Sequence, residues 1–212
     1  MSGLHHSVRR RELAGILLFV AITQFAFLAN ISQIMYDGYS IEDTLLSDLG
    51  RWEQPSALLF NTSLVMFGLL GMSIGVVLWP DKKLNFIPLL FVLCGIGMLI
   101  MAAFPITIEW AHDVGAFLSF VLIAVAALCC YWTFPGPFRY MSLFLGIVGF
   151  VTEILYKSEI YFGLGAAGSE RMIIYPLFFW MAAFAAVLLY SDETAPRDSL
   201  LDRFFAWTAS KF

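Results

Sequence analysis

The stretch "HDVGAFLSFVLIAVAALCCYW", residues 112–132, places a histidine and an aspartate directly before nineteen consecutive residues that carry no charge. A helix needs about 20 mostly apolar residues to cross the hydrocarbon core of a bilayer. The period-two alternation that marks the strands of a membrane β-barrel is absent from this run. The stretch therefore predicts a membrane-spanning helix with polar residues at its first end.

Similar runs recur along the chain, which has 212 residues, 60% of them hydrophobic and 13% charged, and a mean hydropathy of +0.83. A soluble domain is nearer half apolar and a quarter charged. We therefore predict an all-α, polytopic membrane protein, a six-transmembrane-helix bundle over residues 13–190. The six expected spans are 13–35, 56–79, 86–104, 113–132, 140–156 and 171–190.

Lysine and arginine indicate how the bundle is oriented. Of the twelve, three lie on one side of the expected spans, at Arg51, Lys157 and Arg171, and nine lie on the other. By the positive-inside rule, both termini face the cytoplasm. Residues 1–12 then form a cytoplasmic leader, expected to be disordered, and 191–212 a cytoplasmic tail. Its segment "LLDRFFAW" could lie on the inner leaflet as an amphipathic helix.

Several classes of partner and cofactor are excluded. No basic stripe suggests nucleic-acid binding. Cys94, Cys129 and Cys130 all fall inside apolar spans and are expected to be small buried side chains rather than disulfide or metal partners. One central histidine with scattered carboxylates lacks the close spacing of a metal site. We expect no metal and no cofactor.

Ionisable residues near membrane depth are costly and raise a functional hypothesis. Glu153 lies inside the fifth expected span, with Lys157 four residues later, so a simple helix-surface ion pair is an alternative reading. Asp113 is well placed as an N-cap or first-turn acid. That reading leaves His112 unexplained. Asn61, in the second span, has a structural alternative to a functional role, which is a hydrogen bond across helices.

The orientation brings these residues to one rim of the bundle, on the extracytoplasmic side. We therefore expect a polar pocket there, in which His112 and Glu153 are tentative catalytic residues that act as an acid/base pair or as headgroup ligands. The expected ligand-binding residues are Asp48, Asn61, Asp113 and Lys157.

Glycine spacing suggests close helix packing. Gly71 and Gly75 form a small-xxx-small pair, and Gly95 with Gly97 and Gly146 with Gly149 recur in later spans. Such faces let helix backbones approach closely. The contacts are expected to be mostly internal, but a homo-oligomer or a membrane-complex partner bound through these faces is an open alternative.

The segments "LLSDLGRWEQPSALLFNTSLVMFGLLG", "EWAHDVGAFLSFVLIAVAALCCYW" and "TEILYKS" together resemble the prokaryotic domain-of-unknown-function family nine-nine-eight (DUF998). More remotely, they are similar to the eukaryotic Frag1/DRAM/Sfk1 group. The resemblance implies six spans and membrane-lipid handling. The positions that match the motifs are Ser47, Asp48, Gly50, Pro55, His112, Gly115, Ala116 and Glu153.

Three functions fit this pattern in a multi-pass protein of the cell membrane. The first is binding or processing of a lipid or amphiphile headgroup, with membrane lipid as the partner; whether the protein is an enzyme stays open. The second is a non-catalytic scaffold or accessory subunit of a membrane complex. The third is an ion or small-solute conduit, which the almost wholly apolar inner halves of the spans disfavour.

Overall fold

The computed structural model describes residues 2–190, and the tail 191–212, with its predicted amphipathic segment, lies outside the described residues. Helices make up nearly all of this part of the chain, and no strand occurs in it. The α-helices are α1 (Ser2–Met35), α2 (Ala57–Leu78), α3 (Ile87–Ala103), α4 (Glu109–Ala116), α5 (Leu122–Thr133), α6 (Pro137–Lys157) and α7 (Gly165–Leu189). Two short 3-10 helices, η1 (Ser47–Gly50) and η2 (Lys82–Leu84), and a π-helix, η3 (Phe117–Val121), complete the set.

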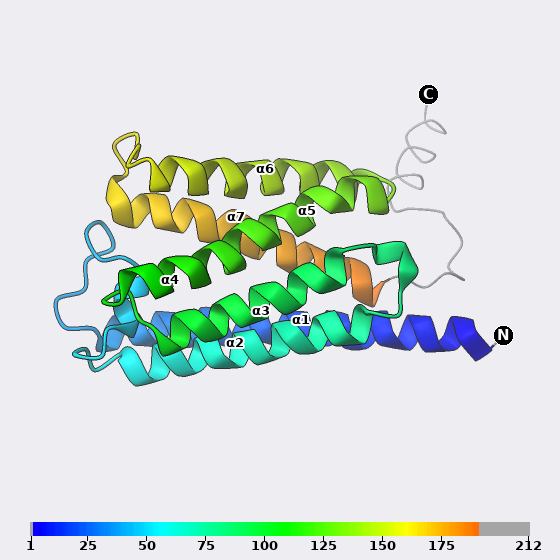
Figure 1. The fold of residues 1–212 in the computed structure, drawn as a ribbon, viewed down its shortest axis with the longest axis horizontal. Helices are drawn as coiled ribbons and strands as arrows, with labels where there is room; N and C mark the ends of the chain where they lie inside the picture. Colours follow the sequence, from blue (N-terminus) through cyan, green and yellow to red (C-terminus); the bar gives the residue numbers. More distant parts are fainter. Residues whose placement is uncertain (1, 191–212) are drawn as a thin grey trace, which may run out of the picture.

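The helices form an elongated bundle of roughly parallel and antiparallel rods (Figure 1). Because α4, η3 and α5 follow one another without a break, they make one rod, Glu109–Thr133. Each rod packs on the next in sequence, and α7 closes the ring against α1. We call the end with the start of α1 and the finish of α7 the terminal end, and the opposite end, with η1, the loop end (Figure 1).

Five helices are long and apolar enough to cross a membrane, and their bounds follow the predicted spans closely. The remaining rod, α3, is apolar but has 17 residues. The last span differs most from the prediction, because α7 begins at Gly165 rather than at residue 171. The extra turns, residues 165–170, are rich in glycine and end at a charged residue, Glu170, so the hydropathy pattern did not include them in the span.

The predicted disorder of the leader is wrong, since α1 runs as one helix from Ser2 into the first span. The stretch from Arg9 to Glu12 consists of good helix formers and contains no proline or glycine, so the helix propagates through it. An ion pair of 2.7 Å between Arg11 Nε and Asp81 Oδ2 joins this stretch to the turn after α2.

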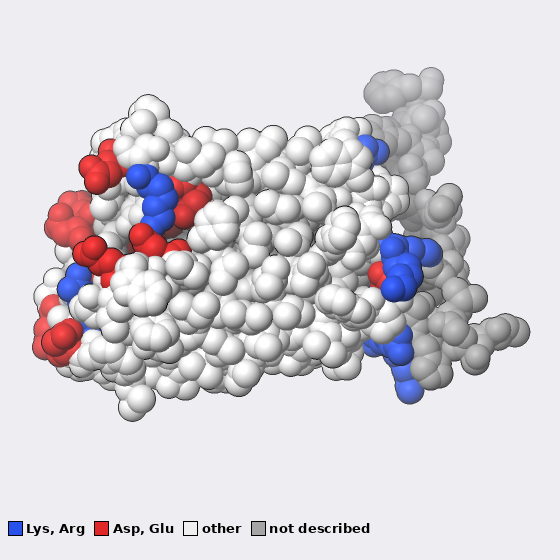
Figure 2. Space-filling view, in the orientation of Figure 1, with Lys and Arg blue, Asp and Glu red and all other residues white. Residues whose placement is uncertain are grey.

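Acidic side chains gather at one end of the bundle and basic side chains at the other. On the face drawn in Figure 2, a broad uncharged band lies between a loop end rich in Asp and Glu and a terminal end where Lys and Arg gather. An uncharged belt flanked by polar ends is the surface expected of a protein that lies in a bilayer.

The terminal-end half of the bundle is filled by aromatic side chains. Trp180 is fully buried and stacks on Phe184, with ring centroids 5.1 Å apart, and on Phe91, at 6.3 Å. Its indole N–H donates to Ser142 Oγ at 3.0 Å, so the one polar atom of the ring is satisfied. This half therefore combines large apolar contacts with a paired polar group.

Glycines let α2 and α3 pack backbone to backbone. A Cβ on Gly75 would lie 2.5 Å from the carbonyl oxygen of Pro88, and one on Gly95 would lie 2.5 Å from that of Gly68. Gly146 and Gly149 face neighbours on α5 and α7 in the same way. The close contacts that these glycines allow are thus made within the chain.

Candidate functional site

Glu170, near the start of α7, anchors the connection between α1 and α2 at the loop end. Glu170 is buried, and its two carboxylate oxygens accept hydrogen bonds from the backbone N–H groups of Leu46 and, at 3.1 Å, Ser47. These amides lie at the start of η1, where the first N–H groups of a helix lack intrahelical partners. Glu170 therefore fixes η1 against α7 across more than 120 residues of sequence.

Arg171, the next residue, clamps the same connection from its other side. Its guanidinium donates to Tyr39 Oη at 2.7 Å and to the Thr44 carbonyl oxygen at 3.1 Å, and within α7 to Ala167 O at 2.8 Å. A buried guanidinium needs several acceptors to offset its lost hydration. Together, Glu170 and Arg171 hold the connection between α1 and α2, residues 36–56, against this end of the bundle. We call this connection the lid.

Asp48 and Asn61, both predicted ligand-binding residues, take structural roles in this lid. Asp48 Oδ2 accepts from the Leu45 N–H at 2.9 Å, and Oδ1 accepts from Arg51 Nε at 2.6 Å. The second bond raises the pKa of the Arg51 guanidinium above its ordinary value. Asn61 Nδ2 donates to the carbonyl oxygen of Gly50 at 2.9 Å, so α2 also holds η1. The structure brings neither residue into contact with His112 or Glu153.

His112 lies on α4 beneath this lid, with 9% of its surface exposed. Close packing of α4 on α3 sets its depth, because a Cβ on Gly115 would lie 2.8 Å from the Gly97 carbonyl oxygen. His112 Nδ1 is 3.1 Å from the carbonyl oxygen of Phe104. Since a carbonyl only accepts, Nδ1 carries the hydrogen, and Nε2 of the neutral ring is a free acceptor.

Glu153 lies on the inward face of α6 and is 6% exposed. Within residues 2–190, no hydrogen bond or ion pair reaches its carboxylate. The alternative reading, a helix-surface pair with Lys157, does not hold, because Lys157 Nζ donates to Asp113 Oδ1, across to α4, at 2.6 Å. Glu153 is thus a buried acid that lacks a protein partner.

The predicted capping role of Asp113 is also wrong. Because α4 begins at Glu109, Asp113 follows four helical residues, and its side chain makes no cap. It stands at the rim, where its side chain is 60% exposed and that of Lys157 is 41% exposed. The extra turn of α4 points Asp113 toward α6, which explains its choice of partner.

His112 and Glu153 line the same small cavity, which we call the polar chamber. They do not hydrogen-bond to each other in the structure, and the cavity between the surrounding helices is about 50 Å³. The rest of its lining comes from η1, α4, α6, α7 and neighbouring turns, and consists of Ser47, Ile106, Asp113, Ala116, Phe120, Tyr156, Lys157, Glu170 and Ile173.

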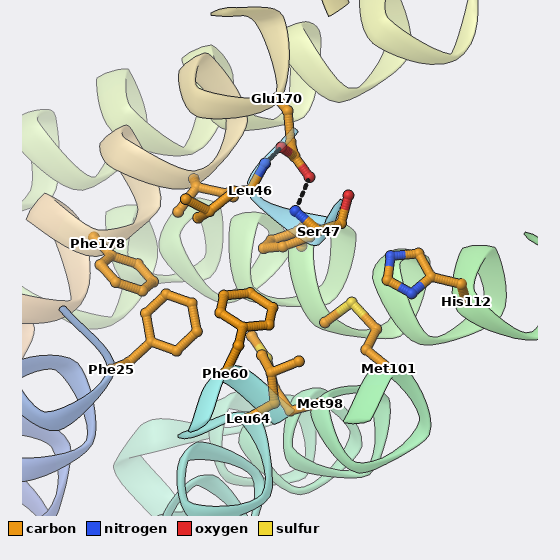
Figure 3. A pocket seen from close by; sticks show the side chains of 12 residues that line it. Phe25, Leu46, Ser47, Phe60, Leu64, Met98, Met101, His112, Glu170 and Phe178 are labelled. Carbon is orange, nitrogen blue, oxygen red and sulfur yellow. Dashed lines mark hydrogen bonds between the residues drawn. The ribbon is translucent and has the colours of Figure 1, made fainter. Parts of the chain in front are cut away.

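A second cavity, the inner cavity, is lined by residues of α1, η1, α2, α3, α4, η3 and α7 and by Leu46 (Figure 3). The two share Ser47, His112, Phe120 and Glu170. Apart from these polar groups the inner cavity is apolar, and Figure 3 shows Phe25, Phe60 and Phe178 on the side away from His112. Its polar groups therefore gather on the side next to the chamber.

The polar chamber also adjoins an open groove, which we call the lateral groove. This groove lies between the rod α4–η3–α5 and α6. Its volume is about 590 Å³, and the two hollows share Asp113, Glu153 and Lys157. The other walls are almost entirely apolar: Val114, Phe117, Leu118, Val121, Phe150 and Ile154, with Ser158 at the loop end. An apolar groove on the bundle surface therefore lies next to a polar chamber within the bundle.

The π-helix η3 forms part of the groove wall through Phe117, Leu118 and Val121. A π-turn is rare, and it occurs often at functional sites because it displaces side chains from regular helical positions. Here, Ser119 on the same turn points away from the groove, toward the carbonyl oxygen of Cys94 at 3.5 Å. The local change in helix type therefore coincides with the lateral groove.

Sequence reasoning named Ser47 only as a motif position, and it did not place Glu170 and Arg171 in the chamber or its lid. These two residues are the ones it missed. They carried a signal, since an acid and a base stand side by side next to an apolar span. Their placement at the edge of the expected span made them look solvated. Only the extra turns of α7 bury them.

Within residues 2–190, no group of three or more His, Cys, Asp or Glu side chains is placed so that it could hold a metal ion. Cys94, Cys129 and Cys130 are free thiols, and none of them forms a disulfide. The polar chamber therefore offers one unpartnered carboxylate and one imidazole acceptor, not a metal-ligand set.

A family described as "Protein of unknown function (DUF998)" matches residues 13–187. The chain belongs to the DUF998 family. The match covers all six rods and every residue of the polar chamber, so the resemblance seen in the motifs is confirmed. No curated protein and no solved structure matches the chain. The more remote similarity to the Frag1/DRAM/Sfk1 group stays a prediction.

Proposed function

We propose that this DUF998 protein binds a membrane lipid or a similar amphiphile at the outer leaflet of the cell membrane. The headgroup occupies the polar chamber, and a hydrocarbon chain lies in the lateral groove. The observation that supports this most strongly is that the two hollows share part of their lining, with an apolar groove of about 590 Å³ next to the buried, unpartnered Glu153.

In this proposal, all six rods cross the bilayer, and both termini are cytoplasmic. The 17 residues of α3 extend roughly 25 Å at 1.5 Å per residue, slightly less than a hydrocarbon core of about 30 Å, a mismatch that local thinning accommodates. An even number of passes agrees with the start of α1 and the finish of α7 lying at one end (Figure 1). The basic terminal end then faces the cytoplasm, and the chamber faces outward.

This arrangement matches the chemistry of a lipid. The groove wall at Phe117, Val121 and Phe150 is exposed to the bilayer side of the bundle and offers the contacts that an acyl chain needs. The ion pair of Asp113 with Lys157 stands at the loop end of the groove, at the depth of headgroups. His112 and Glu153 are ligands for the headgroup in this proposal, one step further inside.

Native mass spectrometry of the purified protein tests the proposal. We expect the wild-type chain to retain lipid, and we expect Val114→Trp to reduce the retained amount by filling the groove, since Val114 is a wall residue. The matched control is Val65→Trp on α2, because Val65 is also partly exposed but lies outside the groove. Equal lipid occupancy in both variants, with both folded, would overturn the proposed site.

A second comparison tests the chamber. We expect the double variant His112→Ala with Glu153→Gln to retain less lipid than the wild type after extended delipidation in detergent. Lipidomic analysis of the extract identifies the headgroups that are lost. If wild-type and double-variant proteins retain the same lipids in the same amounts, the polar chamber does not bind headgroups.

A further inference from the structure

We propose that the headgroup selected by the polar chamber carries a primary ammonium, as in phosphatidylethanolamine, and that Glu153 binds it. The inference rests on the proposed function and specifies its ligand class. It starts from Glu153, which is 94% buried (6% exposed) and has no hydrogen-bond or ion-pair partner in residues 2–190. A buried carboxylate that lacks a partner is costly, so a group that enters the chamber and supplies donors or positive charge gains free energy there.

The nearest protein cation is engaged elsewhere. Lys157 lies one turn after Glu153 on α6, but its ammonium is 2.6 Å from Asp113 Oδ1, at the rim. The other buried cation at this end, Arg171, is held by Tyr39, Thr44 and Ala167. The chamber therefore has an acid whose charge no basic side chain at the loop end offsets through a direct contact.

The remaining open groups of the chamber also accept hydrogen bonds. His112 donates from Nδ1 to the Phe104 carbonyl, which leaves Nε2 of the neutral ring as an acceptor on a residue that lines the chamber. Glu170 already receives the Leu46 and Ser47 amides. A primary ammonium has three N–H donors and no acceptor, so it complements Glu153 and His112 together. A trimethylammonium group has no N–H donor to give them.

The position of Lys157 fits the other half of the same headgroup. Residues four apart on a helix lie about 5–6 Å apart at their Cβ atoms, so Glu153 and Lys157 present opposite charges side by side. A phosphoethanolamine head has the matching order, with its phosphate at the rim and its ammonium inward. The small size of the chamber, about 50 Å³, suits the unsubstituted ammonium.

The experiment measures lipid binding to the full-length protein in detergent by native mass spectrometry. The probes are dioleoyl phosphatidylethanolamine and dioleoyl phosphatidylcholine, which share acyl chains and differ in three methyl groups on nitrogen. We expect the wild type to bind the ethanolamine lipid about tenfold more tightly, because charge-assisted hydrogen bonds are gained. The variant Glu153→Gln should bring the ratio close to one, and the exposed acid Glu109→Gln should leave it unchanged.

The outcomes separate the inference from the proposed function. If both lipids bind the wild type equally, or if dioleoyl phosphatidylglycerol binds more tightly than the ethanolamine lipid, the ammonium preference is overturned while lipid binding stands. If no probe binds, both proposals fail. Because the wild-type ratio is measured without any substitution, the inference stays testable even if Glu153→Gln does not fold.

Discussion

The two halves of the bundle differ in how they are packed and in where their buried polar groups lie. At the terminal end, Trp180, Phe91 and Phe184 stack without a sizeable gap, and Ser142 satisfies the indole N–H. At the loop end, the carboxylates of Glu153 and Glu170 and the imidazole of His112 line cavities, and within residues 2–190 no hydrogen bond or ion pair reaches Glu153. The difference separates a half packed by large apolar side chains from a half with polar groups around cavities, where we propose that a ligand binds.

The largest effect should follow from breaking the aromatic core. We expect Trp180→Ala to destabilise the protein by about 3–5 kcal/mol, because a fully buried ring is removed and a cavity remains. Thermal unfolding in detergent, followed by circular dichroism, measures the loss. Trp132→Ala is the matched control, since Trp132 is 76% exposed. Equal losses in the two variants would show that the stacked core is not the source of stability.

The next effect concerns the lid. We expect Glu170→Gln to cost about 1.5–3 kcal/mol, because an amide keeps one acceptor oxygen and turns an N–H₂ group toward a backbone N–H. Hydrogen exchange should become faster in the segment 44–50 before it changes in α2. Unchanged exchange there would contradict the role of Glu170 as the anchor of η1.

A smaller effect should come from the packing of α2 on α3. We expect Gly75→Ala to cost about 1–2 kcal/mol, since its Cβ would lie 2.5 Å from a backbone oxygen and the gain in helix propensity offsets only part of the strain. Gly71→Ala, one turn earlier, is the control, because its Cβ would find its nearest neighbour at 3.4 Å. A denaturation series that ranks Gly71→Ala as the more damaging change would reverse this assignment.

The smallest effect is expected at the rim of the chamber. Asp113→Asn removes the partner of Lys157 in an exposed ion pair, and such pairs contribute less than about 1 kcal/mol. We therefore expect the unfolding temperature to change little, while lipid binding changes because Lys157 becomes free to meet a phosphate. A large drop in stability would show that the rim belongs to the structural half of the comparison.

The location of the site was predictable in part. His112 and Glu153 drew attention because ionisable groups in apolar spans are costly, and the structure places both in one chamber. Asp48 drew attention through its motif and its place at the outer rim, and Asn61 as a polar residue inside a span. In the structure, Asp48 accepts from Leu45 and Arg51, and Asn61 donates to Gly50. Residue type and membrane depth alone do not distinguish a polar group that holds a loop from one that faces a cavity.

The sequence by itself determined that the chain is a helical membrane protein with several apolar helices, because hydropathy is summed along a continuous segment; the structure then showed five of the six expected spans as long helices and the third as a shorter one. Only the tertiary structure decided which charges pair. Lys157 has Glu153 four residues away in sequence, yet it binds Asp113, 44 residues away, and Glu170 caps amides more than 120 residues away. Partner choice depends on how the helices pack and how far each one extends, and both are settled by contacts between segments rather than within them.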